Sequence, residues 1–246
     1  MVNRLLLFGL PALALCLACA AGAADAPVSG TAADIDQTLT RCLADPEKQS
    51  TGGQDECIVD ATHAWDARLN STYQSLRDAL PETARPVLLA AQRAWLASRD
   101  ADLKLIAAVY ATVHGTMYAP ANANDVMLLT QRRAQTLARY RDEVASAASE
   151  RSRPASVKAA GHAQTTDVER WGRRMARRLP SASRDIVRTS NEKWRDFTSA
   201  EKGLIAAVCP SDGNPKAQTC RSAQAARETT ARVQWLKALD GMIGAD

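Results

Sequence analysis

The chain has 246 residues, a formal net charge of +4 and a hydrophobic content of 46%, with only 4% aromatic residues. Because Ala and Arg are abundant and β-branched runs are rare, this composition favours helix almost throughout. After the N-terminal segment, no stretch approaches the roughly 18 consecutive apolar residues of a membrane-spanning helix.

The N-terminal segment, "MVNRLLLFGLPALALCLACAAGAADAP", is typical of a secretory signal peptide. Arg4 supplies a positive charge, an apolar run follows, and small residues up to Ala23 provide a cleavage site. Residues 1–23 are therefore predicted to be removed on export, which makes the protein periplasmic or secreted. A lipid-anchored form is the alternative, because Cys19 lies near the end of the apolar run. It is less favoured, because Cys16 stands three residues before Cys19 where Leu is preferred.

Export changes how the cysteines are interpreted. The mature chain retains four of them, and an even number in an oxidising compartment argues for disulfides. Four cysteines allow three pairings. We favour the local pairs, which each close a loop of roughly 10 to 15 residues worth about 3 kcal/mol. A zinc site is disfavoured, because no His or second Cys lies two to five residues from any of the four. The favoured pairs are Cys42 with Cys57 and Cys209 with Cys220.

Apolar residues at helical spacing predict three long helices in the first half of the mature chain. Pro81 stands where the second of them is expected to begin, since a first-turn proline loses no hydrogen bond. A short segment around 35–43 precedes the three helices, and the stretch "YATVHGTMYAPANAND", residues 110–125, interrupts the pattern as a loop. The three apolar stripes span 58–80, 88–109 and 126–144.

The pentapeptide "LIAAV" occurs at 105–109 and again at 204–208, which is an offset of 99 residues. At this offset other residues coincide without a gap, and a match that includes a Trp and a Leu-Pro pair indicates a duplication rather than chance. We therefore predict an all-α fold of two tandem small antiparallel helical bundles, at 34–147 and 165–246, joined by a small, polar linker at 148–164. The coinciding pairs include Leu80 with Leu179, Pro81 with Pro180, Trp95 with Trp194, Asp102 with Glu201, Arg133 with Arg232 and Leu137 with Leu236.

Three separated motifs in the first copy, "WDARLNSTYQSL", "LLAAQRAWLASRDAD" and "LTQRRAQTL", follow a Cys-to-Cys segment in this order. Together they resemble the LprI-like lysozyme-inhibitor domain family, which consists of exported bacterial helical domains. The resemblance covers roughly 42–144, and one departure is Leu103, where the family often has a Cys. The second copy resembles the family only through the repeat. The matching residues are Asp66, Leu69, Asn70 and Tyr73, then Ala91, Gln92, Ala94, Trp95, Arg99 and Asp100, and finally Thr130, Arg133 and Leu137.

Several of these motif residues are polar and share a face with the apolar stripe of their helix. One interpretation is a structural network, because half-buried polar groups need hydrogen-bond partners. Arg99 and Arg133 would then bind backbone carbonyls or carboxylates, and the candidate carboxylates are Asp66 and Asp102. The other interpretation is a binding groove. The structural network is favoured, because the second copy keeps the Trp, as Trp194, but has Thr where Arg99 stands.

The residue pattern contains no evident reaction centre. His63, His114 and His162 lie in different segments without metal-ligand spacing, and the mature cysteines are assigned to disulfides. The tetrapeptide "SNEK" at 190–193 matches S-x-x-K but lacks every companion motif. A Gly-rich phosphate-binding loop is also missing. We therefore predict a protein that is not an enzyme and that needs no cofactor or metal.

The net charge conceals a division between the two copies. Residues 24–150 contain 12 Lys and Arg against 17 Asp and Glu, whereas residues 151–246 contain 18 against 10. An acidic first copy suits a cationic protein target, because complementary fields speed encounter. A basic second copy suits an anionic envelope surface, although a solvated face is the simpler interpretation of its arginine run. Nucleic acid is not expected as a partner of an exported protein. The run comprises Arg170, Arg173, Arg174, Arg177 and Arg178.

The leading hypothesis rests on the resemblance. It is an exported cell-envelope protein that binds and inhibits a lysozyme-type peptidoglycan hydrolase, or muramidase, by occluding its cleft. The candidate contact edges are the 110–125 loop and the loop between Cys209 and Cys220. The alternative is a non-inhibitory structural or adaptor module of the cell envelope. The candidate partner-binding residues are His114, Met117, Tyr118, Arg173, Arg174 and Arg177.

Overall fold

The computed structural model describes residues 30–148, 164–209 and 216–245. The predicted signal peptide, most of the predicted linker and His162 lie outside these ranges. Within them every regular element is a helix, which confirms the all-α prediction, and none of these helices is long and apolar enough to cross a membrane. The helices are α1 (Ala32–Ala44), α2 (Thr51–Ala79), α3 (Arg85–Tyr110), α4 (Ala119–Ala148), α5 (Thr165–Arg178), α6 (Arg184–Val208) and α7 (Ala217–Met242).

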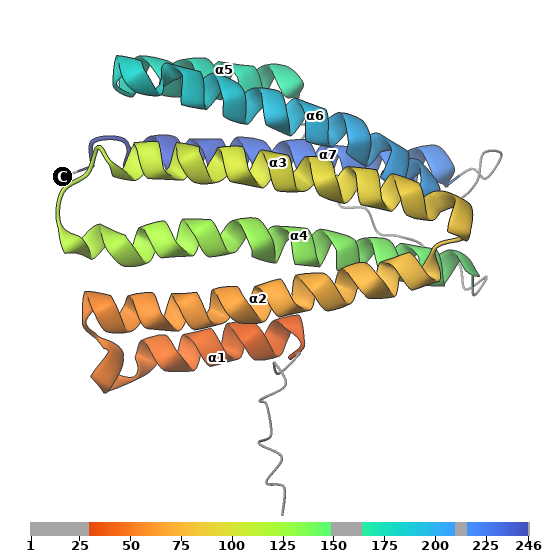
Figure 1. Ribbon diagram of the computed structural model, residues 1–246, viewed down its shortest axis with the longest axis horizontal. Coiled ribbons are helices and arrows are strands. Elements are labelled where there is room, and N and C mark those ends of the chain that lie inside the picture. The colour runs from red at the N-terminus through yellow and green to blue at the C-terminus, as the bar shows by residue number, and fades with distance from the viewer. Residues whose placement is uncertain (1–29, 149–163, 210–215, 246) are drawn as a thin grey trace, which may run out of the picture.

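The helices form one elongated bundle and lie roughly along its length (Figure 1). α2 and α4 lie side by side, and α1 covers the outer side of α2. α3 leaves this group and packs along α6, while α5 and α7 complete the second half. The middle helix of each half, α3 or α6, therefore forms the main contact with the other half.

A single hydrophobic core runs through both halves. Trp65, Leu76 and Leu105 of the first half are inaccessible to solvent, and so are Met175 and Leu236 of the second. The two predicted tandem bundles thus share one core. The apolar stripe of α3 is covered mainly by α6 rather than by the other helices of its own half.

α3 and α6 run antiparallel and approach each other closely. Asp102, in the second half of α3, bonds to Ser190 near the start of α6. Val87, near the start of α3, meets Gly203 near the end of α6, where a Cβ would lie only 3.1 Å from Cγ1 of Val87. The glycine therefore permits a helix separation that a larger residue would oppose.

The boundaries of several elements recur at the offset of 99 residues. The short 3-10 turns η2 (Glu82–Ala84) and η4 (Ser181–Ser183) correspond, and so do the first residues of α3 and α6. This correspondence agrees with the duplication, which stays a prediction. Pro81 is extended and precedes η2, so α3 begins later than expected, at Arg85. α4 begins earlier than expected, at Ala119, which shortens the predicted loop to residues 111–118.

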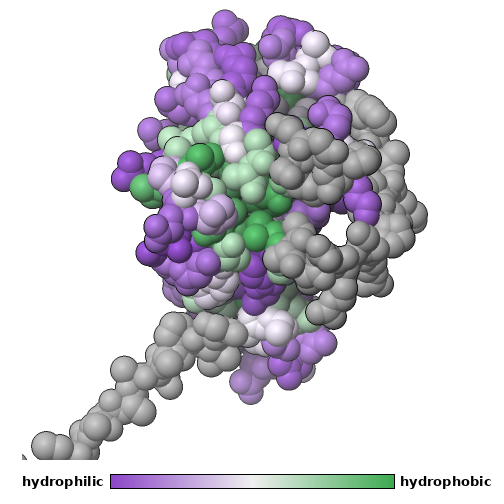
Figure 2. All heavy atoms as spheres, turned by 90° about the vertical axis from the view of Figure 1, so that its right-hand side faces the viewer, coloured by the Kyte–Doolittle hydropathy of each residue, from purple (hydrophilic) through white to green (hydrophobic). Residues whose placement is uncertain are grey.

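Both predicted local disulfides, Cys42–Cys57 and Cys209–Cys220, are present. The first joins α1 to α2, and the second joins the end of α6 to α7. Figure 2 looks onto the end of the molecule at which α2 turns into α3 and α6 ends. Apolar residues gather in the middle of this face, and hydrophilic residues lie on those sides of them where described residues are seen.

Candidate functional site

The residues of the LprI-like motifs divide into a buried and an exposed set. Leu69, Trp95 and Arg133 are only 3%, 7% and 2% exposed, so they belong to the core of the bundle. Asp66 and Asn70 lie on the surface of α2. Tyr73, Gln92 and Arg99 are intermediate, Thr130 is buried and Asp100 is exposed.

Polar motif residues from three helices line one groove. It has a volume of about 650 Å3 and is bordered by Asp66 and Asn70 of α2, Arg99 of α3 and Thr130 of α4. Nδ2 of Asn70 donates to Oδ2 of Asp66 at 3.2 Å. The guanidinium group of Arg99 binds the neighbouring Asp100 at 2.9 Å rather than Asp66. The groove thus combines carboxylate, amide, hydroxyl and guanidinium groups, which together can hydrogen-bond a polar partner surface.

Two buried ion pairs connect the halves reciprocally. Nη1 of Arg133 donates to Glu201 at 2.7 Å, and both side chains are 1% exposed. Nε of Arg133 donates to Gln92 at 3.0 Å. Nη1 of Arg232 binds Asp102 at 2.8 Å. In each pair the arginine comes from the last helix of one half and the carboxylate from the middle helix of the other half. The structural-network interpretation fits Arg133, but its carboxylate partner is Glu201 and neither of the candidates Asp66 and Asp102.

Glu201 and Arg232 were not predicted from the sequence as site residues. Their only signal in the sequence is that they coincide with Asp102 and Arg133 at the offset of 99. Trp194 was predicted as a site residue, and it is buried. The guanidinium carbon of Arg232 lies 5.9 Å from the centre of the Trp194 ring. Trp194 therefore belongs to this network.

The connection between α3 and α4 is held to the C-terminal segment by hydrogen bonds. The hydroxyl of Tyr118 donates to the carbonyl of Ala245 at 3.0 Å. The amide of Gly244 donates to the hydroxyl of Thr112, also at 3.0 Å. These contacts fix the conformation of the connection against the end of the bundle.

Met117 projects from this connection. Its side chain is 71% exposed, the largest value for a big apolar side chain among the described residues. His114 is exposed as well, and Gly115 turns the chain between them with a φ of 101°, in the left-handed region that favours glycine. At the base of the connection, Tyr110 donates its hydroxyl to Asp125 at 2.8 Å. Burial raises the pKa of both groups.

The basic run on α5 is partly engaged in packing. Nε of Arg174 binds the carboxylate of Asp240 at 2.8 Å, and Arg178 binds the same carboxylate. These contacts hold the end of α7. Nη1 of Arg173 lies 3.7 Å from Oε2 of Glu169 on the same helix, and Arg177 is exposed. Binding of this run to an anionic surface stays a prediction.

The two candidate contact edges lie at opposite ends of the bundle. The α3–α4 connection is at the end that also carries the C-terminus (Figure 1). The Cys209–Cys220 disulfide joins α6 to α7 at the other end. Residues 210–215 of that second loop lie outside the described residues. One partner cleft can therefore engage one edge but not both.

The S-x-x-K match is part of the buried network. Ser190 donates its hydroxyl to Asp102 at 2.6 Å and accepts a hydrogen bond from Arg232 at 2.7 Å. Lys193 binds Asp196 instead, at 3.3 Å. Across the described residues, no group of three or more His, Cys, Asp or Glu is placed to hold a metal ion.

Comparison with known proteins finds a matching family and similar solved structures. Residues 42–137 match the family described as Lysozyme inhibitor LprI. No curated protein sequence matches the chain. The crystal structure of an uncharacterized protein from Burkholderia thailandensis is similar over 86% of this chain and 98% of that chain, with 30% sequence identity and a TM-score of 0.67. The structural similarity extends into the second half, whereas the family match covers only the first.

Proposed function

Residues 42–137 match the lysozyme inhibitor LprI family, and from this premise we propose that the chain is an exported protein that binds and blocks a lysozyme-type peptidoglycan hydrolase. The observation that carries this proposal is the family match, which spans α2, α3 and most of α4. The two disulfides support an exported location, because disulfides persist in oxidising compartments.

The proposed mechanism is occlusion of the substrate cleft by the end of the bundle that carries the α3–α4 connection. Met117 offers an exposed, adaptable apolar side chain, a type that is enriched in protein interfaces. The hydrogen bonds of Tyr118 and Thr112 to the C-terminal segment hold the connection in one conformation. Little conformational entropy is then lost on binding, which favours affinity. His114 adds a polar group beside the apolar contact.

The charge of the first half supports a cationic target. Residues 24–150 contain 12 basic and 17 acidic residues. A negative field attracts a cationic enzyme and speeds association, and salt screens this attraction. We therefore expect inhibition to be strongest for cationic lysozymes and to weaken as the salt concentration rises.

A wall-lysis assay with several classes of lysozyme tests this proposal. The mature protein should inhibit at least one class at a stoichiometric ratio. Met117→Glu should weaken inhibition, because it places a charge at the apolar contact. Leu89→Glu is the matched control, because Leu89 is also an exposed apolar residue, at 41%, but lies on α3 away from the connection. Failure to inhibit any class at excess protein would refute the proposal.

A second candidate function is a structural or adaptor module of the envelope without a hydrolase partner. The burial of Trp95 and Arg133 favours it, because these motif residues stabilise the bundle and would serve any partner equally well. The exposed arginines of α5, which include Arg173 and Arg177, would then contact an anionic envelope surface. Capture of a non-hydrolase envelope protein, together with no inhibition of lysozymes, would support this function.

A further inference from the structure

A second cavity lies where the two halves meet. Its volume is about 390 Å3, and its walls come from α3, α4, α6 and α7. This volume is within the range of roughly 300 to 1,000 Å3 for small-molecule sites. Among the described residues that line it, the acidic ones are Asp102 and Glu228, and six are arginines. These are Arg99, Arg132, Arg133, Arg139, Arg227 and Arg232.

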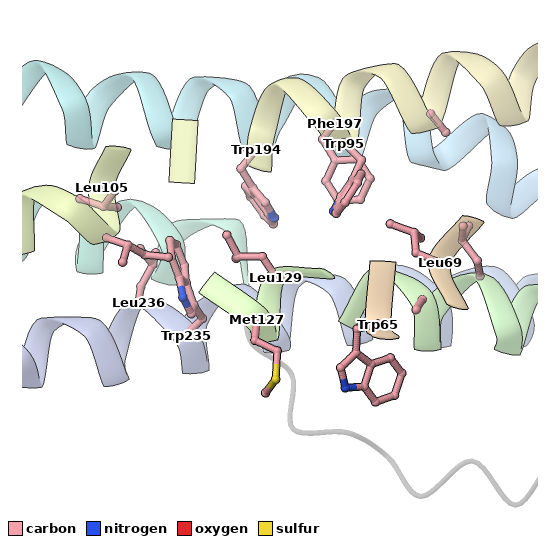
Figure 3. Close-up of a cluster of buried hydrophobic side chains, with 14 of the residues drawn as sticks. Trp65, Leu69, Trp95, Leu105, Met127, Leu129, Trp194, Phe197, Trp235 and Leu236 are labelled. Atoms are coloured by element: carbon pink, nitrogen blue, oxygen red, sulfur yellow. The ribbon is translucent and has the colours of Figure 1, made fainter. Parts of the chain in front are cut away.

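Aromatic rings support the guanidinium groups of this cavity. The guanidinium carbon of Arg133 lies 5.3 Å from the centre of the Phe197 ring. Those of Arg232 and Arg132 lie 4.6 and 6.0 Å from the centre of the Trp235 ring. Figure 3 shows Phe197 and Trp235 among the side chains between the helix layers. A guanidinium group stacked on a ring keeps its N–H groups available, because they point along its own plane.

Several buried N–H groups of the lining find no hydrogen-bond partner among the described residues. Arg133 and Arg232, which carry two of these groups, are only 2% and 5% exposed. A buried donor without an acceptor is costly, and native proteins rarely keep one without a reason. Their concentration in one cavity indicates a ligand that supplies acceptors. The groups are Nη2 of Arg132, Nη2 of Arg133, Nε of Arg139, Nε of Arg232 and Nε1 of Trp235.

The lining also has an excess of positive charge. Carboxylates of the other half neutralise Arg133 and Arg232. Arg132 differs, because its Nε donates to the carbonyl of Leu128 on its own helix at 2.9 Å, and among the described residues no carboxylate lies within ion-pair distance of it. Burial lowers the pKa of Arg132, which reflects the cost of keeping this cation in the cavity. A bound anion would offset that cost.

We propose that this cavity binds a small organic anion whose carboxylate or phosphate oxygens accept hydrogen bonds from Arg132, Arg133 and Arg139. An anion fits better than a neutral ligand, because the unpaired groups of the lining are donors on or beside cations. Glu228 opposes an anion only in part, because its carboxylate already accepts a hydrogen bond from Thr136 at 3.2 Å and lies 3.9 Å from Nη2 of Arg139. The side chains of Arg99 and Arg139 are 28% and 40% exposed, so the cavity opens to solvent beside them. This site is separate from the proposed hydrolase contact at the end of the bundle.

Binding is tested on the full mature protein with four probes at constant ionic strength. Inorganic phosphate, glucose 6-phosphate and glucuronate are the anions, and glucose is the neutral control. Titration calorimetry measures affinity, and thermal unfolding measures the rise in Tm that a ligand of the native state produces. We expect glucose 6-phosphate or glucuronate to bind and raise Tm, and glucose to do neither. The comparison of the two organic anions identifies the preferred group, and a lack of binding by both at millimolar concentration would overturn the proposal.

The variant Arg132→Gln tests whether Arg132 binds a ligand or only stabilises the fold. The variant removes one unpaired donor and one partly buried charge, and it keeps both ion pairs between the halves. Affinity for the organic anion should fall by roughly tenfold or more, which matches the loss of a charged hydrogen bond. The Tm of the free protein should stay the same or rise, because burial disfavours the charged form of Arg132 and no carboxylate of the described residues forms an ion pair with it.

Arg141→Gln is the matched control for this variant. Arg141 lies on the same helix, outside the cavity, and binds its neighbour Asp142 at 2.7 Å. Neither affinity nor Tm should change in this control. An unchanged affinity in Arg132→Gln, or a lower Tm of that free variant, would show that Arg132 serves packing and would overturn the proposal.

Discussion

Replacing Glu201 by Gln removes one charge from a pair of side chains that are each 1% exposed. Arg133 is then left as a buried cation beside a neutral amide. At the N···O distance of 2.7 Å, the Coulomb attraction is about 6 kcal/mol for an effective dielectric constant of about 20. The desolvation of both ions already offsets much of this attraction in the native protein. Loss of one partner of such a pair costs about 3 to 5 kcal/mol, a large part of the roughly 5 to 15 kcal/mol that stabilise a protein.

Thermal unfolding of Glu201→Gln measures this cost. For a chain of this size each kcal/mol lowers Tm by about 2 to 4 °C, so the expected decrease is about 6 to 20 °C. Circular dichroism and tryptophan fluorescence should report the same transition, with both disulfides intact. The double variant Arg133→Met/Glu201→Met is the control. It should be less destabilised than Glu201→Gln, because no unpaired charge remains in the core.

A loss below about 1 kcal/mol in Glu201→Gln would refute this reasoning, since it would mean that the buried arginine does not need the carboxylate. The double variant could also lose as much stability as Arg133→Met and Glu201→Met lose together when each is made alone. That result would refute the reasoning as well, because the effects of two coupled residues do not add. Asp102→Asn removes the reciprocal carboxylate from Arg232 and provides an independent repeat of the experiment.

The remaining predictions concern the ends of helices. Gly53→Ala should destabilise the protein by about 1 to 3 kcal/mol in urea unfolding, because its Cβ would lie 2.8 Å from the backbone of the preceding turn. Gly52→Ala has open space around it and should be neutral or stabilising by up to about 1 kcal/mol, so equal effects of the two substitutions would contradict the packing. Tyr118→Phe should speed amide exchange in the α3–α4 connection with little change in global stability, and unaltered exchange would argue against its hydrogen bond to the C-terminal segment. Hydrogen bonds from Thr31 lower the pKa of Asp34 in the first turn of α1. The stability that these hydrogen bonds give the helix is therefore fully present above the ordinary pKa of Asp, and it is lost as the pH falls through the lowered pKa. Amide exchange in α1 should therefore rise on acidification in the wild type and respond less to pH in Thr31→Val.

Each half needs the other for its stability, because α3 packs on α6 and two buried ion pairs join the halves. In isolation, the first half would leave Asp102 and Arg133 without their partners and would expose the face of α3 that α6 covers. The reciprocal pattern, in which an arginine of each half meets a carboxylate of the other, has the form of a twofold interface between identical subunits. A duplicated domain that had paired with a second copy of itself would show this pattern.

The LprI motif residues could be recognised in the sequence, because their order and spacing are local properties. Their roles could not be separated there, since the same helix carries residues of both kinds. Trp95 faces the core, whereas the guanidinium group of Arg99 reaches the groove between α2, α3 and α4. Sequence also could not show that Arg132 would be partly buried and without an ion pair to a carboxylate, because that depends on how the side chains of α7 meet those of α4.

The helices, the turns after α2 and α5 and the two disulfides were determined by the sequence alone, because each depends on residues that are close in the chain. Helical periodicity shows which face of a helix is apolar, but it does not show which other apolar face will cover it. Since the two halves carry equivalent stripes, α3 had possible partners in both, and only the tertiary structure decided that it packs on α6. That choice places each buried arginine beside a carboxylate of the other half, and it forms the arginine-lined cavity between them.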